Sequence, residues 1–230
     1  MSQNLSKIDE IVRKNPKPVI STKADGTPVT VLDVALSELV EGICTENFPQ
    51  VVFYSEEKFS KWGFPLLALD PLDGTKEYIE GRDEWAISVG LFESDRFEGQ
   101  GWIYNPITRE CFHEGKPVPF RKAEIYRGEI SHTEWKSGLF TTSITRAFSV
   151  KPVGSIAYKL GRLAAGKSSF VVSKRPKNIW DIAGGTLLCK SAGLRFYSRG
   201  REVTTVSELY EPPLIWCHEE LFPELSSIFY

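Results

Sequence analysis

Hydrophobic positions in the first half of the chain predict a helix packed against a mostly antiparallel sheet. Apolar residues recur every three or four positions between 31 and 46, which is the spacing of a helix. Short apolar runs at 51–54 and 66–69 predict strands, and each runs directly into acidic residues. An antiparallel meander is predicted at 85–92, 101–104 and 110–113.

The second half alternates helix and strand patterns, as in an α/β layer. Helices are predicted at about 155–165, 181–191 and 218–229, and strands at 169–172, 194–197 and 213–217. The stretch 115–150 is polar, contains proline and glycine, and shows little periodicity. We therefore expect two lobes, an α+β lobe over 1–130 and an α/β lobe over 131–230.

Bulk composition is that of an ordinary globular protein and excludes several classes. The chain has 230 residues, of which 41% are hydrophobic and 25% charged. No run approaches the ~18 apolar residues that a membrane helix needs, and the first six residues form no apolar signal core. The formal net charge of −2 does not favour nucleic acid. We expect a cytoplasmic protein without a membrane span or a nucleic-acid partner.

Acidic residues follow the predicted strands and carry the candidate chemistry. Glu56 and Glu57 follow one strand, Asp70 ends the next, Asp73 lies in a Pro-Gly turn, and Asp181 opens a later helix. Clustered carboxylates repel one another unless a cation compensates. Ligands that are all oxygen favour Mg²⁺, Mn²⁺ or Ca²⁺ over Zn²⁺. The four cysteines are scattered without a CxxC pair, which also disfavours zinc.

The turn from Asp70 to Thr75 has two interpretations when it is considered alone. Pro71 stiffens it, the Leu72 carbonyl lies between two aspartates, and Gly74 allows close approach to the backbone. The residues after Gly74 can start a short helix, whose free N–H groups suit a phosphate. The other interpretation is a simple turn with a helix cap.

Four segments in order resemble the inositol monophosphatase superfamily of metal-dependent, lithium-sensitive phosphatases. They are Asp33, Glu56-Glu57, Asp70-Pro71-Leu72-Asp73-Gly74-Thr75 and Trp180-Asp181-Ile182-Ala183-Gly184-Gly185. The resemblance covers about 20–230 and implies a layered αβαβα sandwich of the sugar-phosphatase type. Few residues precede Lys23, so the family's long first helix is expected to be short or absent.

The resemblance implies roles for individual residues. Glu56, Asp70 and the Leu72 carbonyl would hold one Mg²⁺, and Asp70, Asp73 and Asp181 a second; a weaker third ion would lie near Glu56 and Glu57. Mn²⁺ would substitute and Li⁺ would inhibit. Catalytic residues would be Asp33, Thr75 and Glu57. Gly74, Thr75 and Ser155 would bind substrate. Apart from the resemblance, the basic segment 174–177, which begins with Lys174 and lies just before Trp180, either binds a second phosphate of the substrate or is a solvated loop.

Within the superfamily, Lys76-Glu77-Tyr78 resembles the 3'(2'),5'-bisphosphate nucleotidases, and so does the segment from Lys23 to Thr30. Adenosine 3',5'-bisphosphate is therefore the expected substrate. An inositol or sugar monophosphatase is the alternative, and a non-catalytic phosphate-binding protein is a third. The resemblance allows a monomer or a homodimer.

One competing motif is out of context. Residues 161–168 fit the Walker A expression, but the predicted helix precedes them and the strand follows. A P-loop needs the opposite order. We therefore expect a helix end near Gly166 rather than an ATP site.

Overall fold

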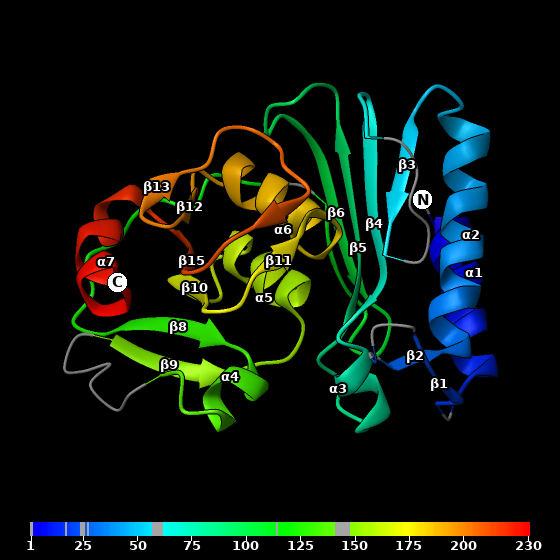
Figure 1. Cartoon of the computed structure of the whole chain (residues 1–230), viewed down its shortest axis with the longest axis horizontal. Helices are drawn as coiled ribbons and strands as arrows, with labels where there is room; N and C mark the ends of the chain where they lie inside the picture. The colour runs from blue at the N-terminus through cyan, green and yellow to red at the C-terminus, as the bar shows by residue number, and fades with distance from the viewer. Residues whose placement is uncertain are drawn as a thin grey trace.

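Helices and sheets alternate in layers across the molecule (Figure 1). The computed structural model describes residues 2–16, 18–23, 26, 28–56, 62–113, 115–140 and 148–230. Helices α1 (Ser2–Lys14) and α2 (Val31–Asn47) cover one face of the first sheet, and α5 (Ile156–Ala164) and α6 (Ile179–Ser191) lie between the sheets. Helix α7 (Phe222–Phe229) covers the outer face of the second sheet. The expected αβαβα sandwich is confirmed.

The first sheet has the strand order β3-β4-β5-β6-β7. Its strands are β3 (Val52–Ser55), β4 (Leu66–Asp73), β5 (Ala86–Phe92), β6 (Gly99–Asn105) and β7 (Glu110–Phe112). Strand β3 is parallel to β4, and β4 is antiparallel to β5. Strands β5 to β7 form the predicted antiparallel meander. Side chains alternate across this sheet, with Leu67 and Leu69 packed toward α2 and Leu66 and Ala68 packed toward α5 and α6.

The second sheet has the order β13-β12-β15-β10-β8-β9. Its strands are β8 (Tyr126–Ile130), β9 (Phe148–Pro152), β10 (Phe170–Ser173), β12 (Arg195–Ser198), β13 (Arg201–Glu202) and β15 (Leu214–Cys217). Strand β8 is parallel to both β9 and β10, whereas β15 is antiparallel to β10 and β12. A second, two-stranded pairing joins β11 (Lys177–Asn178) to β14 (Leu209–Tyr210).

The polar stretch 115–150 contains elements that its sequence did not predict. Strands β8 and β9 flank the short helix α4 (His132–Lys136). Strand β8 is buried at four of its five positions, so it lacks the alternation that marks a half-exposed strand. Because β8 pairs within the second sheet, the change from one sheet to the other falls between Phe112 and Tyr126, ahead of the boundary expected at residue 130.

The N-terminal helix is short rather than absent. Helix α1 docks through Tyr104, whose hydroxyl donates to Asp9 Oδ1 at 2.7 Å. A small hairpin of β1 (Ile20–Thr22) and β2 (Pro28–Thr30) then leads into α2. Thr30 caps α2 in a capping box with Asp33, which fixes the first turn of that helix.

Helix α6 lies unusually close to the first sheet because small residues face each other. A Cβ at Gly90 would lie 2.5 Å from Ala183 Cβ, and one at Gly101 would lie 2.1 Å from the Gly184 carbonyl oxygen. Glycine at these positions removes the side chains that would hold the layers apart. Helix α6, whose first turn carries Asp181, thus packs against β4, β5 and β6.

The Walker-like segment is a helix end, as predicted. Helix α5 stops at Ala164, Gly166 adopts φ +71°, and strand β10 follows. Lys167, where a P-loop lysine would stand, pairs with Glu110.

The 3₁₀ turn Glu219–Leu221 precedes α7. Within the described residues, no helix is long and apolar enough to span a membrane.

Candidate active site

Strand β4 carries two aspartates into the middle of the molecule. Asp70 is 2% exposed and lies on the face of the sheet that packs against α5 and α6. Its Oδ1 accepts a hydrogen bond from the Leu72 N–H at 2.9 Å. The pairing of β4 with β5 is irregular between Asp70 and Asp73, and the strand continues to Asp73 instead of ending in a turn at Asp70 as expected. The irregularity turns both carboxylates toward the helices.

Electrostatics show that the expected carboxylates lie near one another. Burial raises the pKa of Asp70 well above its ordinary value, and the charges of Glu56, Asp73 and Asp181 raise it further. Burial also raises the pKa of Asp181 to about 7; Lys177 opposes this, whereas Asp73 and Glu56 add to it. A buried cluster of this kind needs compensating positive charge to remain ionised at neutral pH.

Several of these carboxylates have one oxygen in a hydrogen bond or an ion pair with a neighbouring group. Asp73 Oδ2 accepts from Ser155 Oγ at 2.5 Å and from the Ala157 N–H at 2.6 Å. Asp181 Oδ2 accepts from the Asn178 N–H at 3.1 Å. Lys23 Nζ lies 2.6 Å from Glu56 Oε1. These contacts orient the side chains around Asp70.

The donor set fits a hard divalent cation in its chemistry and charge. It consists of carboxylates and the Leu72 carbonyl, the oxygen ligands that Mg²⁺ prefers. Among the described residues, no three acidic, histidine or cysteine side chains already form a metal cage. For Asp70, Asp73 and Asp181, the hydrogen bonds described above use one oxygen each, and the second oxygen is a candidate ligand atom.

Thr75 and Asp33 come together as the resemblance implied. Thr75 Oγ1 lies 3.2 Å from Asp33 Oδ1 and 3.2 Å from the Leu72 carbonyl oxygen. The other oxygen of Asp33 accepts from the Thr30 N–H at 2.7 Å and from the Thr30 hydroxyl at 2.5 Å. The capping box of α2 therefore fixes the carboxylate that faces Thr75.

Gly74 and Ser155 bring two helix starts together. Gly74 precedes α3 (Thr75–Ile79) with φ +100°, and a Cβ there would lie 3.0 Å from Trp85 Cβ and 3.3 Å from Ser155 Cβ. Ser155 caps α5 by accepting from the Tyr158 N–H, and it adopts φ +50°. The first N–H groups of a helix have no partner within that helix. Both helix starts thus adjoin Asp73.

The loop before α5 is held by two groups that sequence reasoning missed. Lys159 is 1% exposed, and its Nζ donates to the carbonyls of Val153, Gly154 and Ser155 at 3.0, 3.3 and 2.9 Å. Burial lowers the pKa of Lys159 to about 8. Glu84 Oε2 accepts from the Gly154 N–H at 2.8 Å. A single lysine within an apolar helix was the available sequence signal for Lys159.

A cavity of about 230 Å³ opens beside this loop. Acidic, hydroxyl and cationic side chains contribute to its lining, and the cationic ones are Lys76, Lys159, Arg175 and Lys177. Glu134 also lines the cavity, and its carboxylate already accepts three hydrogen bonds. The donors are Ser131 Oγ, Ser173 Oγ and the Lys174 N–H. The cavity therefore presents several cations next to Asp73 and Gly74.

Two expected site residues are not among these groups. The ammonium of Lys174 lies 5.6 Å from the centre of the Phe140 ring and 5.7 Å from that of Phe229, so the structure does not bring it to the cavity. Its neighbours Arg175 and Lys177 line the cavity instead. Glu57 lies outside the described residues.

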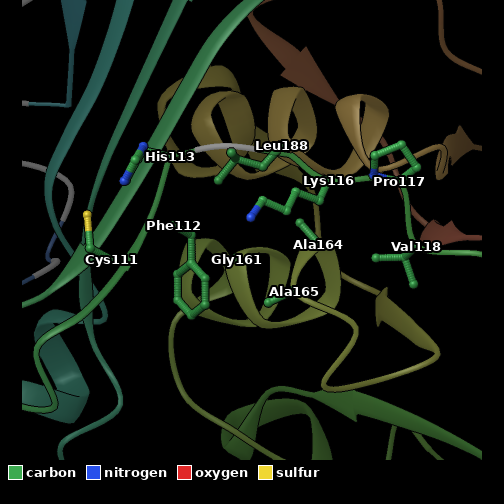
Figure 2. A pocket seen from close by; sticks show the side chains of 10 residues that line it. All are labelled: Cys111, Phe112, His113, Lys116, Pro117, Val118, Gly161, Ala164, Ala165 and Leu188. Atoms are coloured by element: carbon green, nitrogen blue, oxygen red, sulfur yellow. The ribbon is translucent and has the colours of Figure 1, made fainter.

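A separate cavity lies near β7, away from the carboxylates. Figure 2 shows Lys116 extended between Phe112 and Leu188, with Gly161 and Ala164 of α5 below. Its volume is about 380 Å³. None of the expected site residues lines it, so the cavity beside Asp73 is the candidate substrate site.

Comparison with known proteins gives a consistent family assignment. The sequence model of the inositol monophosphatase family matches residues 3–217. The chain is 26% identical over 197 residues to the 3'(2'),5'-bisphosphate nucleotidase CysQ of Escherichia coli, covering 77% of this chain and 78% of that protein. It is 25% identical over 191 residues to inositol monophosphatase 3 of Solanum lycopersicum, covering 72% and 71%.

A solved structure supports the fold. An IMPase/NADP phosphatase complexed with Mg²⁺ and phosphate superposes with a TM-score of 0.80 at 18% identity, covering 97% of this chain and 92% of that one. Such a match extends over both sheets and the helices between them.

Proposed function

This chain belongs to the inositol monophosphatase family, and on this basis we propose that it is a Mg²⁺-dependent phosphomonoesterase acting on a nucleotide bisphosphate. The observation that carries the proposal is the buried Asp70, surrounded by the carboxylates of Glu56, Asp73 and Asp181. Holding three further carboxylates around the buried Asp70 destabilises the fold unless cations bind among them. This need for a cation supports the proposed metal site.

We assign the cation ligands as the family resemblance implies. Glu56, Asp70 and the Leu72 carbonyl would hold one Mg²⁺, and Asp70, Asp73 and Asp181 another; a third ion near Glu56 and Glu57 remains part of the proposal. The solved relative that contains Mg²⁺ and phosphate supports the choice of ion. When bound, such ions activate a water and stabilise charge on the leaving oxygen.

The chain itself orients the water and receives its proton. Thr75 Oγ1 donates toward Asp33, which leaves the lone pairs of this hydroxyl to accept from a water in the site. Asp33 then takes the proton that Thr75 passes on, in general base catalysis. With Glu57, these residues form the proposed catalytic set.

The phosphate would rest on the N–H groups of Gly74 and Thr75 at the start of α3. Gly74 has no side chain to block this approach. A Cβ added at Gly74 would lie 3.3 Å from Ser155 Cβ. Ser155 lies on the opposite side of the same space and holds Asp73.

The cations of the cavity favour a substrate with two phosphates. Arg175, Lys177 and Lys76 line the cavity beside the proposed phosphate seat, and arginine and lysine are the usual partners of phosphate. The similarity to a bisphosphate nucleotidase supports the same substrate class. We therefore favour adenosine 3',5'-bisphosphate over an inositol or sugar monophosphate, for which the tomato inositol monophosphatase is the supporting relative.

A non-catalytic phosphate-binding protein is the third alternative. Against it stands the presence of all the expected residues, because loss of catalysis would usually have been accompanied by loss of one of them; they are Glu56, Asp70, Asp73, Thr75 and Asp181. We further propose that the substrate is a small phosphorylated molecule and that the protein acts as a monomer or a homodimer.

The test is phosphate release from adenosine 3',5'-bisphosphate, inositol 1-phosphate and fructose 1,6-bisphosphate. Each assay is run with Mg²⁺, with Mg²⁺ and Li⁺, and with EDTA. We expect the nucleotide to be preferred, Li⁺ to inhibit and EDTA to abolish release. A preference for inositol 1-phosphate would overturn the substrate assignment, and release from none would favour a binding protein.

Asp73→Asn tests the metal assignment. The asparagine oxygen can still accept from Ser155 and Ala157, so the fold should persist. Loss of a group that orients a metal ligand already costs ~10–100-fold, so loss of the ligand itself should lower turnover by at least about 100-fold. The matched control is Asp83→Asn at an exposed position. Equal turnover in the two variants would show that Asp73 is not a ligand.

A further inference from the structure

Ser88 is a buried hydroxyl without a function in the fold. It lies in the middle of β5 and is 0% exposed. Its Oγ has no hydrogen-bond partner among the described residues. Most buried hydroxyls in native proteins are hydrogen-bonded, because an unpaired one loses its hydration without replacement. Ser88 therefore needs an explanation other than packing.

The register of the sheet places Ser88 directly opposite Asp70. The two residues are paired in the antiparallel ladder between β4 and β5. Side chains of such a pair lie on the same face, with Cβ atoms about 4.5–5.5 Å apart. Two residues further along β5, Gly90 contacts Ala183 of α6, which shows that this face of the strand is turned toward α6 and Asp181.

Asp70 has an oxygen to which Ser88 can donate. Its Oδ1 accepts from the Leu72 N–H, and no described residue donates to its Oδ2. The neighbouring carboxylates Glu56, Asp73 and Asp181 are acceptors when ionised, so they cannot supply that donor. Ser88 is the hydroxyl that the ladder brings to this position.

We propose that Ser88 is a positioning residue for the Mg²⁺ site, donating a hydrogen bond to the Asp70 carboxylate when the cation is bound. The proposal rests on the proposed function, since it assumes that Asp70 is a Mg²⁺ ligand. Carboxylate ligands are generally hydrogen-bonded by a second group, which orients them for the metal. Such a bond would give the Ser88 hydroxyl, which has no partner among the described residues, an acceptor.

This reasoning predicts opposite effects of Ser88→Ala on stability and on metal binding. In EDTA, removal of an unpaired buried hydroxyl should raise Tm by about 2–4 °C. In Mg²⁺ titrations by calorimetry, the same variant should bind about 10-fold more weakly. The full chain is used throughout, and wild type is titrated in parallel.

Ser198→Ala is the matched control, since Ser198 Oγ donates to the Glu211 carbonyl at 2.7 Å in the second sheet. It should lower Tm in EDTA and leave Mg²⁺ affinity unchanged. A lower metal-free Tm for Ser88→Ala, or a Mg²⁺ affinity equal to wild type, would overturn the role of Ser88. Absence of Mg²⁺ binding by wild type would instead overturn the proposed function, and the inference with it.

Discussion

At the scale of single residues, the hydroxyl of Thr75 links the Asp33 carboxylate to the turn that follows Asp70. Its Oγ1 lies at the same distance, 3.2 Å, from Asp33 Oδ1 and from the Leu72 carbonyl oxygen. One hydroxyl proton cannot satisfy both acceptors fully, so small changes nearby shift it between them. The side chain is therefore suited to exchange a proton with water.

Replacement of Thr75 separates this chemical role from packing. Thr75→Val keeps the branched shape but removes the hydroxyl, so turnover should fall by about 10²–10⁴-fold, the usual contribution of general acid–base catalysis. Thr75→Ser keeps the hydroxyl and should retain most of the activity. Steady-state phosphate release measures both. If the serine variant were as inactive as the valine variant, the methyl group and not the hydroxyl would be what matters.

The same scale shows which site residues the sequence could predict. Asp33, Thr75, Asp70 and Asp181 could be placed in one expected site because each belongs to a short motif with a fixed residue type, and their roles stay predictions. Lys174 was expected in the site on charge alone, and its ammonium packs over Phe140 and Phe229 instead. Sequence does not reveal which way a lysine in a basic loop turns, because that depends on aromatic rings distant in the chain.

At the scale of elements, the start of α5 depends on a buried cation. Lys159 donates to three consecutive carbonyls before the helix, and Glu84 accepts the N–H of Gly154 from the other side. Ser155 is thereby held at φ +50°, a conformation that non-glycine residues rarely adopt. The clamp presents Ser155 to Asp73, so Lys159 shapes the site without being exposed to it.

The lowered pKa of Lys159 predicts a stability that rises with pH. The pKa is about 8 in the folded state against 10.5 for an ordinary lysine. Between these values the unfolded chain binds the additional proton, so stability increases as the pH rises from 8 to about 10.5. The full difference amounts to about 3 kcal/mol.

Comparison with Lys159→Met isolates this effect, because other groups titrate equally in both proteins. Urea unfolding in EDTA at several pH values between 7 and 10.5 gives the free energy of unfolding of each. We expect the free energy of unfolding of the wild type to increase relative to that of the variant as the pH rises. Parallel curves would show that Lys159 keeps an ordinary pKa in the folded protein.

At the scale of elements, there are physical reasons why the sequence predicted some strands and missed others. The meander β5 to β7 was predicted because polar turns separate its apolar strands. Strand β8 was missed because it has only two large apolar residues, Tyr126 and Ile130, and β9 because it lies at an edge with few apolar residues. The glycines that bring α6 to the sheet are visible in the sequence, but their partners are not.

At the scale of the whole molecule, the candidate site gathers side chains from separate layers of the fold. Asp70 and Asp73 come from the first sheet, Asp181 from the middle helices, and Ser131 and Ser173 of the adjoining cavity from the second sheet and its α4 junction. Repulsion among the carboxylates opposes this assembly. A bound cation would convert the repulsion into attraction across the layers.

Mg²⁺ should therefore stabilise the whole fold and not only the site. At a concentration 100 times its Kd, a ligand that binds the folded state alone adds about 2.7 kcal/mol. For a chain of this length that corresponds to a rise in Tm of about 5–10 °C. Calorimetry in EDTA and in Mg²⁺ measures the difference, and Asp181→Asn should reduce it strongly, since it removes a ligand contributed by the middle layer. A Tm that responds equally in wild type and in Asp181→Asn would mean that Mg²⁺ binds elsewhere on the molecule.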